Sequence, residues 1–173
     1  ENFKQAKQEA RLKLQSYISR VGDDSRDSRR DAENSLKEAR ALQEKFNIPA
    51  GELEADPQLQ EEAKQAMLKV LSSGFLDSFE TIRSNFFVPD EVYAQPEFQE
   101  VARNSAKLEL SSYLNLNRGR LQIARSLQEK FNIPAGELEA DPQLQEEAKQ
   151  AMLKELSSGF LDSFEAIRSN FFV

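Results

Sequence analysis

The sequence contains no cysteine and no histidine. Without cysteine, the chain can form neither disulfides nor thiol-based sites, so its redox compartment is undetermined. The usual zinc ligands are absent, and no serine–histidine or cysteine–histidine catalytic set can exist. No glycine-rich phosphate loop and no Asn-x-Ser/Thr sequon occur. We therefore expect no metal ion and no organic cofactor.

Long apolar runs and a basic charge balance are missing too. No stretch approaches the roughly 20 apolar residues of a membrane span, and the first ten residues, ENFKQAKQEA, lack the apolar core of a signal peptide. The net charge is −7, whereas nucleic-acid binding requires a basic surface. We expect a soluble, folded protein without nucleic-acid or membrane partners, cytoplasmic by default.

What the sequence does contain is a long internal duplication. Residues 41–88 return as residues 126–173, an offset of 85 residues, and only three of these 48 positions differ: Ala41/Ser126, Val70/Glu155 and Thr81/Ala166. A period of this kind indicates stacked units of supersecondary structure. Copies this similar mean recent duplication or deliberate construction. One hypothesis is therefore a structural or engineered array that stacks end to end.

Apolar residues recur at steps of three and four, which predicts amphipathic helices. The pattern predicts helices over residues 1–21, from 27 or 31 to 46, and over 57–73, 75–87, 96–113 and about 118–131, and the duplication adds two more. The inward face of the second helix is predicted to be Ala32, Leu36, Ala39, Leu42 and Phe46, and that of the fourth Phe75, Phe79, Ile82 and Phe86.

Local signals mark where the third helix begins and ends. Asp56 precedes Pro57 as an N-cap residue, and proline is well accommodated at the first helical position. Gly74 follows two serines and is the residue that most easily adopts a left-handed turn. We therefore predict a positive φ at Gly74.

A weaker match extends the repeat to the rest of the chain. The segment from Pro57 resembles the segment from Pro96. At an offset of 96, six residues of the first helix are identical to residues of the segment 102–113: Ala6, Ala10, Leu12, Leu14, Ser16 and Tyr17. The chain is therefore predicted to be one all-α domain over residues 1–173. Its expected architecture is an α-solenoid of eight helices in four stacked hairpins, about 1–45, 46–86, 87–130 and 131–173, which alternate between two types.

This pattern resembles α-solenoid repeats of the tetratricopeptide-like kind. The residues that carry the resemblance are the Ala–x3–Ala spacing of Ala6/Ala10 and Ala102/Ala106, the glycine of LSSG at 71–74, Phe79 and Ile82 of the second helix, and the prolines near the joints, Pro49, Pro89 and Pro134. The resemblance is architectural and covers nearly the whole chain. It implies a non-catalytic scaffold that binds a protein or peptide on a concave face lined by the first helices of the hairpins.

Polar side chains on those first helices are the candidate binding residues. They are Glu62, Gln65 and Lys69, their copies Glu147, Gln150 and Lys154, and Arg103, Asn104 and Lys107 of the middle hairpin. Such a stripe of polar residues is usually the solvated face of a helix. If the chain has a groove, we expect these residues to line it.

An acidic run offers a third hypothesis. The segment DDSRD resembles the Asp-Asp-x-x-Asp motif of all-α prenyl-diphosphate enzymes, in which Asp23, Asp24 and Asp27 would hold Mg²⁺ bound to pyrophosphate. Neighbouring arginines would neutralise such a site, no second acidic motif occurs, and a polar hairpin tip explains the run equally well. The sequence therefore favours a protein that is not an enzyme.

The aromatic residues of the joints are predicted to lie in the core between hairpins. Phe86 continues the apolar stripe of its helix. By analogy with Phe86 and Phe87, we expect Phe171, Phe172 and Val173 to pack on a following hairpin. These three residues are therefore predicted to form a contact surface for end-to-end self-association or for the next unit of a longer array.

Overall fold

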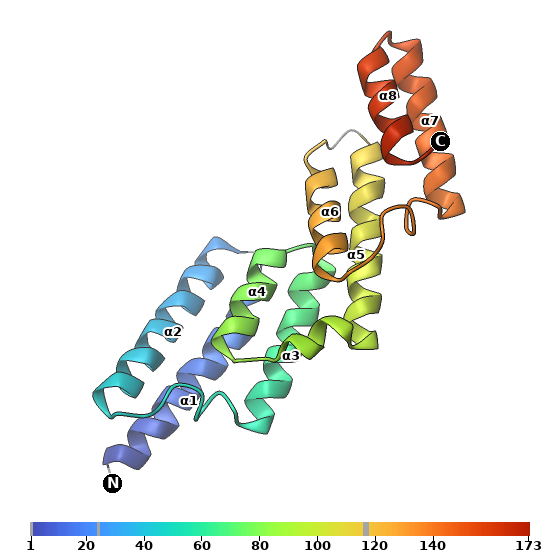
Figure 1. Cartoon of the computed structure of the whole chain (residues 1–173). Helices are drawn as coiled ribbons and strands as arrows, with labels where there is room; N and C mark the ends of the chain where they lie inside the picture. The colour runs from blue at the N-terminus through green and yellow to red at the C-terminus, as the bar shows by residue number, and fades with distance from the viewer. Residues whose placement is uncertain (1, 24, 116–117) are drawn as a thin grey trace. The chain divides into compact units, whose positions relative to one another are not determined.

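The computed structural model describes residues 2–23, 25–115 and 118–173, and these residues form α-helices joined by short connectors (Figure 1). They contain α1 (Asn2–Val21), α2 (Arg26–Lys45), α3 (Pro57–Ser72), α4 (Leu76–Asn85), α5 (Pro96–Leu114), α6 (Arg120–Lys130), α7 (Pro142–Ser157) and α8 (Leu161–Asn170), with a 3₁₀ helix η1 (Asp90–Ala94) before α5. No β-strand occurs in the described residues. The all-α class and the eight helices are thus confirmed, and η1 was not predicted.

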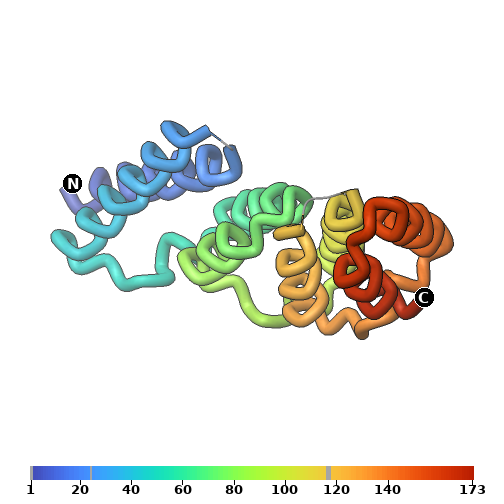
Figure 2. Tube along the Cα trace, turned by 90° about the horizontal axis from the view of Figure 1, so that it is seen from above, coloured from blue at the N-terminus to red at the C-terminus, as the bar shows by residue number. Residues whose placement is uncertain are grey.

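Consecutive helices lie side by side in pairs. α1 packs against α2, α5 against α6 and α7 against α8, and both views place α4 beside α3 (Figures 1 and 2). Contacts divide the chain into two compact units: unit 1 is Glu1–Leu71 with Asp77–Val92, and unit 2 is Ser72–Leu76 with Tyr93–Val173. A single domain over residues 1–173 stays a prediction.

The predicted inward faces agree with the structure in α3 and differ in α2. α3 buries Leu59, Ala63, Ala66, Met67, Val70 and Leu71, as predicted. α2 buries Ala32, Ser35, Ala39 and Gln43 instead of Leu36, Leu42 and Phe46, which are only half-buried. The buried stripe of α2 includes polar residues because they find partners inside. Ser35 Oγ lies 3.2 Å from Ser16 Oγ, and Gln43 Nε2 donates to Glu54 at 2.9 Å.

The prediction for α4 is right at three of its four positions. Phe79, Ile82 and Phe86 are fully buried. The prediction was wrong for Phe75, whose side chain is 43% exposed. Phe75 precedes the first residue of α4, at the tip of the hairpin, where the helical spacing that places the other three inward does not apply.

The joints after α2, α4, α6 and α8 share one left-handed cap. The residues with positive φ are Asn47 (53°), Phe87 (53°), Asn132 (54°) and Phe172 (57°). After α2, the Ile48 N–H donates to the Gln43 carbonyl at 2.8 Å and the Asn47 N–H to the Glu44 carbonyl at 3.2 Å, which is the Schellman pattern. The same cap thus sets the direction in which the chain leaves each hairpin.

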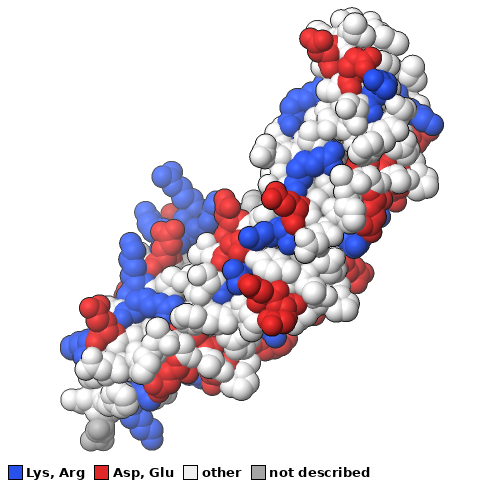
Figure 3. Space-filling model, in the orientation of Figure 1, with Lys and Arg blue, Asp and Glu red and all other residues white. Residues whose placement is uncertain are grey.

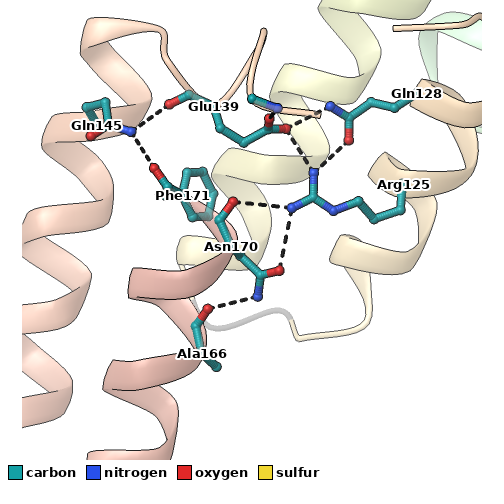
Figure 4. Close-up of polar contacts among 8 residues, drawn as sticks. Arg125, Gln128, Glu139, Gln145, Ala166, Asn170 and Phe171 are labelled. Atoms are coloured by element: carbon teal, nitrogen blue, oxygen red, sulfur yellow. Dashed lines mark hydrogen bonds and ion pairs between the residues drawn. The ribbon is translucent and has the colours of Figure 1, made fainter. Parts of the chain in front are cut away.

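A buried glutamate holds the connector after α6 in place. The side chain of Glu139 is fully buried. It lies 2.9 Å from Arg125 Nη1, accepts from Gln128 Nε2 at 2.7 Å, and also accepts from the Gly136 N–H (Figure 4). A charge can be buried at tolerable cost only when it is paired and hydrogen-bonded in this way. These contacts therefore hold the connector in one position against α6.

The connector after α2 repeats this arrangement. Glu54 is fully buried, pairs with Arg40, accepts from Gln43, and accepts from the Gly51 N–H at 2.9 Å. In each network, the arginine also reaches a carbonyl two helices further along the chain. Arg40 Nη2 donates to the Asn85 carbonyl at 3.0 Å, and Arg125 Nη2 to the Asn170 carbonyl at 3.3 Å.

One glutamine near the start of α3, α5 and α7 links a connector to the end of the following helix. Each side-chain amide donates to two backbone carbonyls. Gln60 donates to the carbonyls of Glu54 (2.8 Å) and Phe86 (2.6 Å), Gln99 to those of Tyr93 (2.6 Å) and Phe131 (2.8 Å), and Gln145 to those of Glu139 (2.8 Å) and Phe171 (2.7 Å). These carbonyls lie outside regular helical bonding, so the amide satisfies acceptors that would otherwise lack partners.

The prediction for Gly74 is confirmed: its φ is +78°, and that of its copy Gly159 is +77°. A Cβ at Gly74 would lie 2.7 Å from Glu109 Oε1, whereas nothing lies within 4 Å of one at Gly159.

We expect Gly159→Val to lower the free energy of unfolding by about 1–2 kcal/mol through backbone strain, and Gly74→Val to lower it by more, because valine also displaces a buried carboxylate. Urea unfolding of both variants measures this difference. Equal losses would mean that Glu109 moves aside freely.

Candidate functional site

Shallow grooves run between the first helices of neighbouring hairpins. In unit 1, a hollow of about 400 Å³ lies between α1 and α3. In unit 2, hollows of about 580, 370 and 290 Å³ follow α5 and α7. Neighbouring hollows share lining residues: Lys107 lines the first two and Glu147 the last two. We call these the α1/α3 groove and the α5/α7 groove.

All nine predicted binding residues line one of these grooves. Glu62, Gln65 and Lys69 line the α1/α3 groove. Arg103, Asn104 and Lys107 of α5 and Glu147, Gln150 and Lys154 of α7 line the α5/α7 groove. The structure thus brings the nine residues together as two groups, one in each unit. Their role in binding stays a prediction.

Two of the three α5 side chains in this set form ion pairs that the helical spacing did not predict. Arg103 pairs with Glu137, and Lys107 Nζ lies 3.4 Å from Asp141 Oδ2. Their partners are the glutamate of the connector and the N-cap aspartate of α7. These ion pairs hold α5 against the start of the next hairpin.

Unit 1 contains two ion pairs that match those of Arg103 and Lys107. Lys7 pairs with Glu52, and Arg11 Nη2 lies 3.2 Å from Asp56 Oδ1. The signal was present in the sequence: Lys7 and Arg11 match Arg103 and Lys107 at the offset of 96, and their partners match at the offset of 85. These side chains are partly exposed, so each ion pair contributes at most about 1 kcal/mol. Their effect is to fix which residues of α1 lie opposite the connector and the start of α3.

The aspartates at the starts of α3 and α7 are confirmed N-caps. Asp56 Oδ1 accepts from the Gln58 N–H at 2.9 Å and the Leu59 N–H at 3.2 Å. Asp141 Oδ1 accepts from the Gln143 N–H at 2.9 Å and the Leu144 N–H at 3.3 Å. Hydrogen bonds from the Leu59 and Leu144 N–H groups, more than the facing Arg11 and Lys107, hold the pKa of each carboxyl below its usual value.

These lowered pKa values predict a loss of stability in acid. A carboxyl whose pKa is lower in the folded state stabilises the fold above its unfolded pKa of about 3.9, and this contribution disappears as the pH falls below that value. We therefore expect the free energy of unfolding to fall between about pH 5 and pH 3. Urea melts of the chain and of Asp56→Asn/Asp141→Asn test this, because asparagine still caps a helix but does not titrate. An equally steep fall in the variant would assign the effect to other groups.

The only charged difference between the two copies lies inside unit 2, on α7. Glu155 is 6% exposed, and its Oε1 lies 2.7 Å from Arg118 Nη2 of the α5–α6 tip. Its counterpart in unit 1 is Val70, which is 2% exposed. There the α1–α2 tip supplies a carboxylate instead, and Lys69 Nζ lies 3.6 Å from Asp23 Oδ1. The α1–α2 tip thus contributes a carboxylate to the ion pair with α3, and the α5–α6 tip contributes a guanidinium to the ion pair with α7.

The acidic motif of the enzyme hypothesis is only partly described. Asp23 pairs with Lys69, and Asp27 lies 3.2 Å from Arg30. Asp24 lies outside the described residues, so the motif as a whole stays a hypothesis. Within residues 2–23, 25–115 and 118–173, no group of three or more metal-ligating side chains is arranged to hold a metal ion. Over the same ranges, no helix combines the length and the apolar character needed to cross a membrane.

The predicted contact surface at the last joint is corrected in part. Phe171 is fully buried and stacks on Tyr113 at a centroid distance of 6.3 Å, both within unit 2. Phe171 is therefore unavailable to a partner, because the preceding hairpin already covers its ring. Phe172 and Val173 are 65% and 37% exposed. A contact through these two residues stays a prediction.

Acidic and basic side chains are interspersed on the visible face of each unit, without an extended area of one sign (Figure 3). A partner that binds this face would therefore be recognised by local pairing of charges and hydrogen bonds more than by long-range attraction.

No protein-family model, no curated protein and no solved structure matches this chain.

Proposed function

We propose that this chain is a non-catalytic α-solenoid scaffold that binds an extended segment of a protein or peptide in the α1/α3 and α5/α7 grooves. One observation carries the proposal: the matching polar faces of α3 and α7 line a groove in each unit. Each unit also contains two matching ion pairs. They join the first helix of one hairpin to a glutamate of the connector and to the N-cap aspartate of the next hairpin. Each groove has polar side chains at regular helical spacing, which suit the repeating amide groups of an extended peptide backbone.

The side chains that line the grooves fit a polar, extended ligand. Glu62, Gln65 and Lys69 of α3 lie at steps of three and four, so they project from one face as an acceptor, an amide and a cation. The same three residue types line the second groove from α7. The amides are held by neighbouring carboxylates: Gln65 Nε2 donates to Glu61 at 3.0 Å, and Gln150 Nε2 to Glu146 at 3.1 Å. An ordered amide costs less entropy when it binds a ligand.

The test is selection from a random peptide library with the full chain as bait. We expect enriched peptides whose affinity falls at least about tenfold, or 1.4 kcal/mol, for the quadruple variant Gln65→Ala/Lys69→Ala/Gln150→Ala/Lys154→Ala. A matched control is Lys37→Ala/Glu44→Ala, since both residues are exposed on α2 outside the grooves. Peptides that bind all three proteins equally, or no enrichment at all, would contradict the proposal.

The alternative is an array whose only role is to stack end to end. The near-identical copies and the recurring joints support it, because both reproduce one way of adding a hairpin. Sedimentation equilibrium separates the two functions. Reproducible oligomers that grow with concentration, together with no peptide enrichment, would favour the array.

A further inference from the structure

The α7–α8 hairpin exposes a cluster of large apolar side chains. Leu153, Leu156, Phe160 and Leu161 are 60%, 51%, 59% and 60% exposed. We call these four residues the α7–α8 patch. The first two lie three positions apart on α7, and the other two lie at the tip and at the start of α8. Clusters of this kind on a folded protein mark interaction sites.

The duplication provides an internal reference for this patch. Its four counterparts are Leu68, Leu71, Phe75 and Leu76. Leu71 is fully buried and Phe75 is 43% exposed, while Leu68 and Leu76 are half-buried. The same sequence therefore has its apolar side chains more covered in the first copy than in the second.

Unit 2 shows what the tip of the first copy packs on. Residues Ser72–Leu76 belong to unit 2 together with α5 and α6. A Cβ at Gly74 would lie 2.7 Å from Glu109 Oε1 of α5 and 3.5 Å from Ile123 Cγ2 of α6, whereas nothing lies within 4 Å of one at Gly159. The first tip is thus docked on a helical hairpin, and the identical second tip is bare.

The corresponding surface of α1–α2 has different chemistry. At the offsets of 96 and 85 residues, Glu109 and Ile123 correspond to Lys13 and Glu38. Lys13 and Glu38 pair with each other and are 36% and 55% exposed. In α1–α2, this ion pair stands where α5–α6 has Glu109 and Ile123. If the apolar tip of another hairpin covered the pair, both charges would lose their hydration. The α1–α2 hairpin of a second copy is therefore a poor occupant for the patch.

We propose that the α7–α8 patch is a docking surface for a helical hairpin with an α5–α6-like face. Such a face offers a branched aliphatic side chain from its second helix and a carboxylate from its first helix, opposite Gly159. Glycine lets that carboxylate approach the backbone as closely as Glu109 approaches Gly74. The proposal is independent of the two grooves, because none of the four patch residues lines either of them.

The test extends the full chain and measures access to the patch. Val173 corresponds to Val88, so residues 89–130 can be appended after Val173 in the register that the first copy uses. The chain has no cysteine, so Leu156→Cys supplies a single thiol in the patch. We expect the extension to slow the reaction of this thiol with a disulfide reagent at least about tenfold, because labelling would then require local opening. Leu71→Cys in the unextended chain is the reference for a covered thiol.

A matched extension tests whether the chemistry of the face matters. It carries lysine and glutamate at the positions copied from Glu109 and Ile123, as in α1–α2. We expect it to leave the thiol as reactive as in the unextended chain. Equal labelling with both extensions, or an extension that adds no helical circular-dichroism signal, would overturn the proposal. A dimer of the unextended chain that Leu156→Glu/Phe160→Glu abolishes would overturn it too, because it would assign the patch to a second copy.

Discussion

Replacing Phe86 with alanine is expected to lower the free energy of unfolding by about 3–5 kcal/mol, because it removes a large ring from a closed core. Phe86 is fully buried and stacks on Tyr17 at a centroid distance of 6.0 Å. Asn85 Nδ2 donates to the Tyr17 hydroxyl at 3.2 Å, and burial raises the pKa of that hydroxyl. The cavity would open where α1 meets the end of α4. Urea unfolding followed by circular dichroism measures the loss.

The neighbouring residue is the control. Phe87 has the same side chain but is 56% exposed, and the carbons of its ring lie 3.9 Å from the Cβ that Gly51 would carry. Phe87→Ala should therefore cost no more than about 1 kcal/mol. Phe171→Ala should match Phe86→Ala, because Phe171 is also fully buried and stacks on Tyr113. Similar losses for Phe86→Ala and Phe87→Ala would refute this placement of the core.

Val70→Glu is expected to destabilise the chain by about 3–5 kcal/mol, the usual cost of a buried charge without a partner. The substitution copies into unit 1 a residue that unit 2 carries at the corresponding position, Glu155. Glu155 is tolerated because Arg118 reaches it from the α5–α6 tip. In unit 1, the α1–α2 tip contributes the carboxylate of Asp23, which pairs with Lys69, the residue before Val70 on α3.

Two further measurements test the electrostatic cause. Burial would raise the pKa of the carboxyl introduced by Val70→Glu, so its folded state would favour the protonated form. The destabilisation should therefore be smaller near pH 4.5 than near pH 8. The reverse substitution, Glu155→Val, should cost little or even stabilise, because valine fits the matching position and the half-exposed Arg118 stays hydrated. A loss for Glu155→Val as large as that for Val70→Glu would contradict the argument.

Val70 and Glu155 also affect which hairpins pack against each other. α3 and α7 are identical except at Val70 and Glu155. The tips beside them differ in charge, with Asp23 in unit 1 and Arg118 in unit 2. An exchange of partners would separate Glu155 from Arg118 and leave its buried carboxylate without that ion pair. The single difference between the two helices therefore disfavours the wrong pairing of hairpins.

The candidate binding residues were predictable as a set, but the contacts of α5 were not. Helical spacing was enough to place Glu62, Gln65 and Lys69 on one face of α3, away from Leu59 and Met67. Spacing within a helix cannot show which residues of another segment lie opposite. The partners of Arg103 and Lys107 are more than 30 residues away along the chain. The offsets of 96 and 85 show that these charges recur in both repeats, but only the folded structure shows that they pair.

By itself, the sequence determined the helices, their ends and the left-handed glycine at Gly74. These features depend on apolar spacing, caps and turns within a few neighbouring residues, and a local pattern contains that information.

Only the tertiary structure decided which apolar faces are covered. Leu71 and Leu156 lie at the same place in copies that differ at three of 48 positions, yet Leu71 is fully buried and Leu156 is 51% exposed. The burial of a side chain depends on what packs against it from elsewhere in the fold. Two nearly identical stretches therefore form the same helices and present different surfaces.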